Sequence, residues 1–292
     1  MMLPTVHHRH IEIDGVRVFY REAGPSDGKV LLLLHGFPSS SRQYARLMDA
    51  LGTRYRLIAP DYPGFGYSDA PRAASEGGDF VYSFDHLADV VEKLCIALKL
   101  EQFALYMFDF GGPVGMRIAE RHPEWITGLI VQNANAYQEG LSPTARELIA
   151  LRPGPEAEAK WAQLLTLEVT RSQYVGGTLV PERVAPDGWT LDQHFLDQPG
   201  RKRLQVDLSL NYQSNVERYP AWQAWMRKYS PPALILWGRN DLFFPEPGAH
   251  AYLRDLPHAQ VHIFETGHFA LEEEAPRMAP LIDEFLASLA TG

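Results

Sequence analysis

The stretch from residue 105 to residue 115 reads Leu105-Tyr106-Met107-Phe108-Asp109-Phe110-Gly111-Gly112-Pro113-Val114-Gly115. An apolar strand pattern runs into a charged residue, and two glycines follow before a helical pattern begins. In a nucleophile elbow, the side chain that follows the strand is held out on a strained turn, and small residues nearby let strand and helix pack closely. Asp109 stands at that position here. The motif by itself fits either a nucleophilic carboxylate or an ordinary aspartate at a helix N-terminus.

Strand-like and helix-like segments alternate along most of the chain around this motif. The strand candidates are the short apolar runs Val30–Leu34, Tyr55–Ala59, Phe103–Phe108, Ile126–Val131, Ala233–Trp237 and Gln260–Phe264. Helical patterns are expected at Gln43–Leu51, Ser83–Leu98, Pro113–Arg121, Ala249–Asp255 and about Ala275–Leu289. Near the N-terminus, apolar alternation on both sides of Asp14-Gly15 is typical of a β-hairpin. Together these patterns predict an α/β fold with a mainly parallel sheet flanked by helices.

The alternation breaks between about residue 136 and residue 219. This stretch carries no strong strand pattern and consists of short helical and Pro/Gly-rich pieces with several aromatic residues. We therefore expect residues 1–135 and 220–292 to form the α/β core. Residues 136–219 are expected to form a helical cap inserted over one edge of the sheet.

Two motifs downstream bear on the role of Asp109. A strand pattern ends in Gly238-Arg239-Asn240-Asp241, and the next strand pattern leads into Gly267-His268, 27 residues further on. Adjacent parallel strands bring such side chains to the same carboxyl edge of a sheet. A single acid or a single histidine would more often be structural, but the order nucleophile, acid, histidine is the order of an α/β-hydrolase.

A fourth motif follows the first long apolar strand. It reads His35-Gly36-Phe37-Pro38. A backbone N–H from this loop, together with the backbone N–H of Phe110, can bind an oxyanion. This loop and Phe110 are therefore candidates for an oxyanion hole.

These motifs resemble the α/β-hydrolase superfamily over nearly the whole chain. Within it they resemble the aspartate-nucleophile branch, which contains epoxide hydrolases and haloalkane or haloacetate dehalogenases. The resemblance implies that Asp109 attacks an electrophilic carbon and forms an alkyl-enzyme ester. It implies that His268 then activates the water that hydrolyses this ester, while Asp241 orients the histidine. It implies that Phe37 and Phe110 supply the backbone N–H groups of the oxyanion hole. It also implies a cis peptide bond before Pro38.

The chain departs from the dehalogenases of this branch at two positions. Haloalkane dehalogenases usually place Trp after the nucleophile and often Asn in the His-Gly loop, and related haloacetate dehalogenases place Arg after the nucleophile. Phe110 and Phe37 occupy these positions here and offer no side-chain N–H. The departures favour epoxide chemistry over halide chemistry.

Epoxide hydrolases of this branch usually use two cap tyrosines to protonate the opening ring oxygen. Tyr174 lies where the first is expected, and Tyr212 is the candidate for the second. An ungapped match of the surrounding motif places Gln213 at the second position, so Tyr137 and Tyr219 are alternatives to Tyr212.

Composition excludes several other classes of function. The 292 residues carry a net charge of −9 without a basic stripe, which argues against nucleic acid or an anionic membrane as a partner. No run approaches the ~20 apolar residues of a membrane span, and Met1–His10 lacks an apolar signal-peptide core, so we expect a cytoplasmic protein. Cys95 is the only cysteine, which excludes an internal disulfide and a thiolate zinc site. No cofactor motif or metal-ligand cluster is present in the sequence, and the oligomeric state stays open.

We expect a hydrolase that converts small apolar epoxides to diols without a cofactor. The alternative within the same branch is cleavage of carbon–halogen bonds. An alternative of another class is an inactive hydrolase fold that serves as a ligand receptor, for which a broken triad would be the sign. Esterase action fits less well, because attack of a carboxylate on an ester gives an anhydride.

Overall fold

The computed structural model describes residues 3–289 and contains an eight-stranded sheet with the order β1-β2-β4-β3-β5-β6-β7-β8. The strands are β1 (Val6–Ile13), β2 (Val16–Ala23), β3 (Val30–Leu34), β4 (Arg56–Pro60), β5 (Phe103–Phe108), β6 (Ile126–Gln132), β7 (Ala233–Gly238) and β8 (Gln260–Phe264). Strands β3 to β8 run parallel, and β2 pairs antiparallel with both β1 and β4. The predicted α/β fold with a mainly parallel sheet is confirmed. Residues 1–2 and 290–292, at the outer ends of the predicted core segments, lie outside the described residues.

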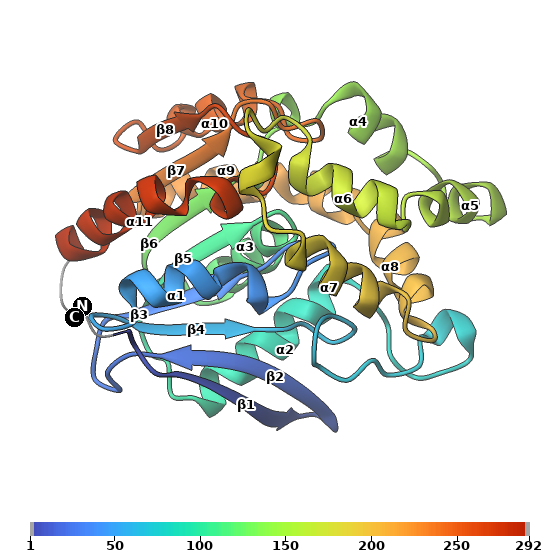
Figure 1. Cartoon of the computed structure of the whole chain (residues 1–292), viewed down its shortest axis with the longest axis horizontal. Helices are drawn as coiled ribbons and strands as arrows, with labels where there is room; N and C mark the ends of the chain where they lie inside the picture. Colours follow the sequence, from blue (N-terminus) through green and yellow to red (C-terminus); the bar gives the residue numbers. More distant parts are fainter. Residues whose placement is uncertain (1–2, 290–292) are drawn as a thin grey trace.

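Helices cover both faces of the sheet, as Figure 1 shows. The helices α1 (Ala45–Leu51) and α11 (Ala270–Ser288) pack with one buried apolar cluster. The helices α2 (Phe84–Ala97), α3 (Gly111–Arg121) and α10 (Pro247–Ala251) pack with the other. Strands β5 and β7 are buried along their whole length, which explains their uninterrupted apolar sequence, because each meets a helical layer on both sides.

The N-terminal hairpin turns at the predicted position. Ile13 pairs with Val16, and the two residues between them, Asp14 and Gly15, have φ angles of 50° and 78°. Positive φ at both central residues is the geometry of a type I′ turn, which Asp-Gly favours. The hairpin extends the sheet at the edge farthest from β8.

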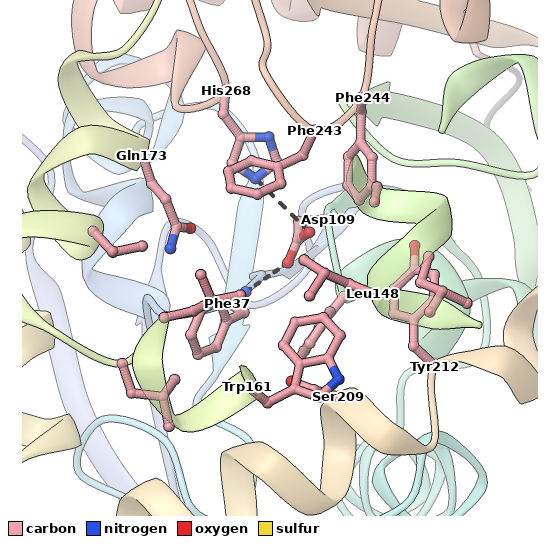
Figure 2. Close-up of a pocket in the computed structure, with 16 residues that line it drawn as sticks. Phe37, Asp109, Leu148, Trp161, Gln173, Ser209, Tyr212, Phe243, Phe244 and His268 are labelled. Carbon is pink, nitrogen blue, oxygen red and sulfur yellow. Dashed lines mark hydrogen bonds and ion pairs between the residues drawn. The ribbon is translucent and has the colours of Figure 1, made fainter. Parts of the chain in front are cut away.

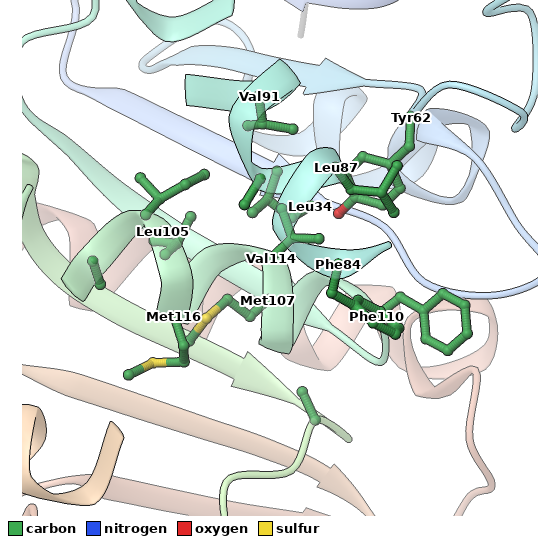
Figure 3. Packing of buried hydrophobic residues seen from close by; sticks show 14 of the residues in the cluster. Leu34, Tyr62, Phe84, Leu87, Val91, Leu105, Met107, Phe110, Val114 and Met116 are labelled. Atoms are coloured by element: carbon green, nitrogen blue, oxygen red, sulfur yellow. The ribbon is translucent and has the colours of Figure 1, made fainter. Parts of the chain in front are cut away.

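Strand β5 and helix α3, which lie on either side of the elbow at Asp109, pack closely against each other. Figure 3 shows Met107 and Leu105 of β5 facing Val114 and Met116 of α3. A Cβ atom on Gly115 would lie 2.7 Å from the Met107 sulfur, so a glycine at this position makes room for the long strand side chain.

A helical excursion separates β6 from β7 and lies over the carboxyl ends of the strands (Figure 1). Its helices are α4 (Pro143–Ile149), α5 (Pro155–Gln163), α6 (Leu167–Val175), α7 (Asp187–Leu196), α8 (Arg201–Leu210) and α9 (Gln213–Tyr229). The sequence-based boundary between residues 219 and 220 falls inside α9, because Pro220 stands within this helix and does not end it.

Two remaining features of the fold concern its helices. Helix α11 starts at Ala270, five residues before the predicted start, and carries Pro276 and Pro280 inside it. Within residues 3–289, none of the helices is long and apolar enough to cross a membrane.

Candidate active site

Asp109 occupies a tight turn between β5 and α3. Its φ angle is 49°, a left-handed conformation that a non-glycine residue adopts only at some cost in free energy. A Cβ atom on Gly36 would collide with the Asp109 side chain, and one on Gly111 would collide with the Leu34 carbonyl oxygen. The two glycines therefore let the nucleophile elbow and the neighbouring loop approach each other.

The loop after β3 holds one oxygen of this carboxylate. The Phe37 backbone N–H donates a hydrogen bond of 2.7 Å to Asp109 Oδ1, as Figure 2 shows. The peptide bond between Phe37 and Pro38 is cis, as the resemblance implied. Burial raises the pKa of Asp109, while the charge of His268 and the backbone N–H groups of Phe37 and Phe110 oppose this rise.

His35 has a structural role in the same loop. Its Nδ1 lies 3.0 Å from the Gly36 carbonyl oxygen, and its Nε2 lies 3.2 Å from the Tyr62 backbone nitrogen, which donates to it. Burial lowers the pKa of His35 to about 3, so the ring stays neutral.

His268 and Asp241 come from the turns after β8 and β7 and meet at the Asp109 carboxylate. His268 Nδ1 lies 2.6 Å from Asp241 Oδ2, and His268 Nε2 lies 3.8 Å from Asp109 Oδ2. Burial lowers the pKa of His268, but the Asp241 carboxylate outweighs this effect, with a smaller contribution from Asp109, and the pKa is raised overall. The three side chains that sequence order predicted to converge therefore lie within reach of one another.

The Asp241 carboxylate is fully hydrogen-bonded. Its Oδ1 accepts the backbone N–H groups of Phe243 and Phe244 at 2.8 and 3.0 Å. Its Oδ2 accepts a hydrogen bond of 2.8 Å from Asn133 Nδ2, besides the bond to the histidine. These bonds fix the direction in which Asp241 faces His268.

Asn133 is a site residue that the sequence analysis missed. It follows β6 with a φ angle of 38°, and its Oδ1 accepts the Gly238 backbone N–H at 2.9 Å. The available signal was its position, a polar residue directly after a buried strand and at the same sheet edge as Asp109.

A narrow cavity of about 80 Å³ opens above Asp109 and His268. Helix α4, helix α6 and the link between α5 and α6 supply most of its apolar wall, namely Ala145, Leu148, Ile149, Leu164, Leu165 and Val169. Phe37, Phe110, Phe243 and Phe244 complete this wall from the core side. A charge that develops in so apolar a space depends strongly on the few polar groups that face it.

Two residues that line the cavity carry a buried hydrogen-bond donor that has no partner among residues 3–289. These donors are the hydroxyl of Tyr212, the residue before α9, and the indole Nε1 of Trp161 on α5. Burial raises the pKa of Tyr212 well above 10, and Tyr219 and Asp109 raise it further, so the Tyr212 hydroxyl keeps its proton. Figure 2 shows both side chains on the side of the cavity away from His268.

Tyr174, expected as a cap acid, does not line the cavity. Its hydroxyl donates to Asp192 on α7, and its ring stacks on Phe269, so the side chain points away from Asp109. The preceding residue, Gln173, faces the cavity instead. The prediction for Tyr174 is therefore wrong, because consecutive residues of a helix point about 100° apart.

The other tyrosine alternatives also stand outside the cavity wall. Tyr137 donates a hydrogen bond of 2.7 Å to Asp255, and Gln213 is exposed on α9. The Tyr219 hydroxyl is buried beside the Tyr212 hydroxyl and helps to raise the pKa of Tyr212.

The arrangement combines a carboxylate on a strained turn, an N–H group at one of its oxygens and a histidine–carboxylate pair beside the other. Such a set can attack an electrophilic carbon and then deliver activated water. Between residues 3 and 289, no three His, Cys, Asp or Glu side chains gather as a metal site would require.

Comparison with known proteins places this fold in a family. A family model described as the alpha/beta hydrolase fold matches residues 29–275. YNR064C of Saccharomyces cerevisiae, an uncharacterized hydrolase, is 38% identical over 280 residues that span 94% of each chain. Epoxide hydrolase 2 of Caenorhabditis elegans is 25% identical over 94% of this chain and 78% of that protein.

The solved structure of haloalkane dehalogenase DbeA from Bradyrhizobium elkani covers 97% of this chain and 98% of its own, with a TM-score of 0.78 and 21% identity. This likeness concerns the fold alone. From the family match and the yeast relative it follows that this protein belongs to the alpha/beta hydrolase family and is a hydrolase.

Proposed function

We propose that this hydrolase opens small, neutral epoxides to diols through a covalent ester on Asp109. The observation that carries the proposal is the pairing of this carboxylate with an unpartnered, protonated tyrosine hydroxyl, that of Tyr212, on the wall of one apolar cavity. An epoxide needs a nucleophile at its carbon and an acid at its oxygen, and these two groups supply both.

In the first step, Asp109 Oδ2 attacks a ring carbon and the bond between that carbon and the ring oxygen breaks. The ring oxygen takes a proton from the Tyr212 hydroxyl and becomes an alcohol. In the second step, His268 Nε2 removes a proton from water, which attacks Cγ of the ester. The Phe37 N–H, already 2.7 Å from Oδ1, stabilises the oxyanion that forms there. Collapse breaks the bond between Cγ and the alkoxide oxygen, which takes the proton held by His268 and completes the diol. The carboxylic acid left on Asp109 gives its proton to the Tyr212 phenolate, which restores both groups.

The charges around the cavity favour a neutral substrate. None of the residues described as lining it is Lys or Arg, and Asp109 brings a negative charge. An anionic substrate would enter an apolar space beside a like charge without a compensating cation. The proposal therefore excludes substrates such as haloacetates.

The relationship to Epoxide hydrolase 2 of Caenorhabditis elegans supports epoxide chemistry. Because that protein is only 25% identical to this chain, a test of the proposal must measure the reaction itself.

A single turnover in H₂¹⁸O tests the covalent route. The diol of the first turnover should carry unlabelled oxygen from Asp109, and the label should appear in the Asp109 carboxylate by peptide mass spectrometry. In His268→Gln, the ester should accumulate as an adduct of enzyme plus substrate. His258→Gln, a change at an exposed histidine, is the control and should turn over normally. Labelled diol in the first turnover without an adduct would contradict the mechanism.

Carbon–halogen cleavage is the second candidate, and the unpartnered Trp161 Nε1–H favours it, because an indole N–H can hold a departing halide ion. A panel of paired epoxides and alkyl halides of equal size separates the candidates by diol formation against halide release.

A further inference from the structure

A buried polar cluster lies between the cap and the core, and the proposed chemistry does not use it. The Tyr174 hydroxyl donates to Asp192 Oδ2 and lies 3.4 Å from the Ser39 hydroxyl. All three side chains are shielded from solvent. Because buried polar groups cost free energy unless they are bonded, this cluster holds α6, α7 and the loop after β3 in one arrangement.

The cluster reaches the oxyanion hole through Ser39. Ser39 lies two residues after Phe37, and its backbone N–H donates to the Gly36 carbonyl oxygen at 3.0 Å, which closes a tight turn. The Phe37 N–H that bonds Asp109 projects from the same turn. A displacement of Ser39 would therefore change the direction of the Phe37 N–H.

The cluster reaches the catalytic histidine through the ring of Tyr174. This ring stacks on Phe269 with centroids 3.9 Å apart and an interplanar angle of 9°. Phe269 directly follows His268 in the chain and contacts its ring edge to face at 5.4 Å. Tyr174 thus touches both loops that carry groups of the candidate active site.

Two charged groups, Arg42 and Glu272, lie close enough to Asp192 to influence its ionisation. Arg42 and Glu272 form an ion pair of 2.6 Å, and both act electrostatically on Asp192. A Cβ atom on Gly188 would lie 2.6 Å from Tyr174 Cε1 and 2.8 Å from Arg42 Nη1, so α7 packs tightly against both. Burial raises the pKa of Asp192 to about 8, against the lowering influence of Tyr174 and Arg42.

We propose that Tyr174, Asp192 and Ser39 are positioning residues that hold the Phe37 N–H and the His268 ring in register for hydrolysis of the Asp109 ester. The inference rests on the proposed function for its kinetic readout. Tyr174 is the residue that was expected to protonate substrate, and its hydroxyl acts here on the protein itself.

This positioning role predicts which of the two chemical steps should slow when the cluster is loosened. Attack of water on the ester needs both the oxyanion N–H and the histidine, whereas the first attack by Asp109 needs neither as strongly. Loosening the cluster should therefore slow ester hydrolysis more than ester formation. A cluster that merely fastened the cap would act on substrate binding and raise KM.

The first experiment is Tyr174→Phe, which keeps the ring on Phe269 and removes the hydroxyl. We expect kcat to fall roughly tenfold, the size of one lost buried hydrogen bond. KM should fall in step with kcat, because kcat/KM reports ester formation, which is unchanged, and rapid-quench mass spectrometry should show more ester at steady state. Tyr252→Phe, which also removes one buried hydroxyl bond but lies outside the cavity wall, is the matched control and should behave like the wild type.

Hydrogen exchange gives a readout that does not need a substrate. In the unliganded enzyme, peptides covering residues 36–40 should exchange faster in Tyr174→Phe and in Ser39→Ala than in the wild type and in Tyr252→Phe. If the wild type opened no epoxide, the proposed function would be wrong. The exchange measurement would still show whether the cluster holds the loop after β3 in place. Ser39→Ala removes one small hydroxyl, so it serves if Tyr174→Phe does not fold.

Asp192→Asn adds a pH signature. Folded Asp192 keeps its proton up to about pH 8, whereas the unfolded chain loses it near its ordinary value of 3.8. Ionisation of Asp192 therefore lowers wild-type stability as pH rises through this window, and Asp192→Asn should flatten the pH dependence of the unfolding midpoint. The proposal would be overturned if Tyr174→Phe and Ser39→Ala both kept the kcat and the exchange rates of the wild type. A change in KM alone would overturn it too.

Discussion

The polar groups at the sheet edge are hydrogen-bonded, whereas two polar groups of the cap are not. At the edge, both oxygens of Asp241 accept hydrogen bonds, and Asn133 bonds through both ends of its amide. In the cap, the buried donors of the cavity residues Tyr212 and Trp161 have no partner among the described residues. Under the proposed mechanism, this difference separates groups that must stay still, which are satisfied in the resting enzyme, from groups that await substrate, which are not.

Removal of the nucleophile should give the largest effect on the edge side of this comparison. Asp109→Asn should lower turnover roughly 10⁴-fold or more, because no other group can form the ester. Its thermal midpoint should stay equal or rise, since burial disfavours the charge of Asp109. Asp49→Asn, an exposed change, is the control. Turnover above about 1% of the wild type would remove Asp109 from the mechanism.

Removal of an open donor in the cap should cost activity without costing stability. Tyr212→Phe should lower kcat on epoxides roughly 100-fold, the lower range for loss of general-acid catalysis. Because its hydroxyl is buried without a partner, the free energy of unfolding should stay constant or rise by about 1 kcal/mol. Chemical denaturation measures this change, with Tyr229→Phe at an exposed position as the control. Clear destabilisation would mean that the hydroxyl is bonded in the resting enzyme.

The pH dependence of kcat should be set by His268 at the sheet edge and not by the groups of the cap. His268 must be neutral to act as base, so kcat should fall about tenfold per pH unit below its pKa. Asp241 raises this pKa above the ordinary 6.5, which places the midpoint of the acid limb above 6.5. Asp241→Asn should move the midpoint to lower pH besides slowing turnover. An acid limb that stays in place would assign it to another group.

Widening the cap wall should give the smallest effect. Leu148→Ala should raise KM for a small epoxide about fivefold, the equivalent of roughly 1 kcal/mol of lost contact, with kcat within about twofold. Longer epoxides should lose less. Ile96→Ala, on the exposed side of α2, is the control for a general effect on folding. Equal KM for all chain lengths would mean that the α4 wall does not contact substrate.

The sequence predicts the edge much better than the cap, and the reason is geometric. Asp109, Asp241 and His268 each follow a recognisable strand, and parallel strands bring their carboxyl ends to one edge whatever the loops do. Asn133 stands at the same edge, but a lone asparagine after a strand has no motif that marks it. The strands of the parallel sheet and the N-terminal hairpin follow from equally local signals, whereas the order of the strands in the sheet was not predicted.

No strand fixes the positions of the cap residues in this way. Gln173 and Tyr174 are neighbours on α6, and only the packing of Tyr174 on Phe269 decides which of the two meets the cavity. Helix ends are likewise uncertain, since α9 and α11 both contain prolines that a sequence pattern takes as boundaries.

The course of α9 has a consequence for recombining this enzyme with its relatives. The helix leaves the cap beside Tyr212 and leads directly to β7, and Arg117 of α3 donates hydrogen bonds to both Ser214 and Asn215 near its start. A chimera joined at residues 136 and 219 would cut this helix in half and pair foreign residues with the guanidinium. Transplanted segments should therefore end before residue 212, which leaves the tyrosine with the recipient scaffold and exchanges only the apolar wall.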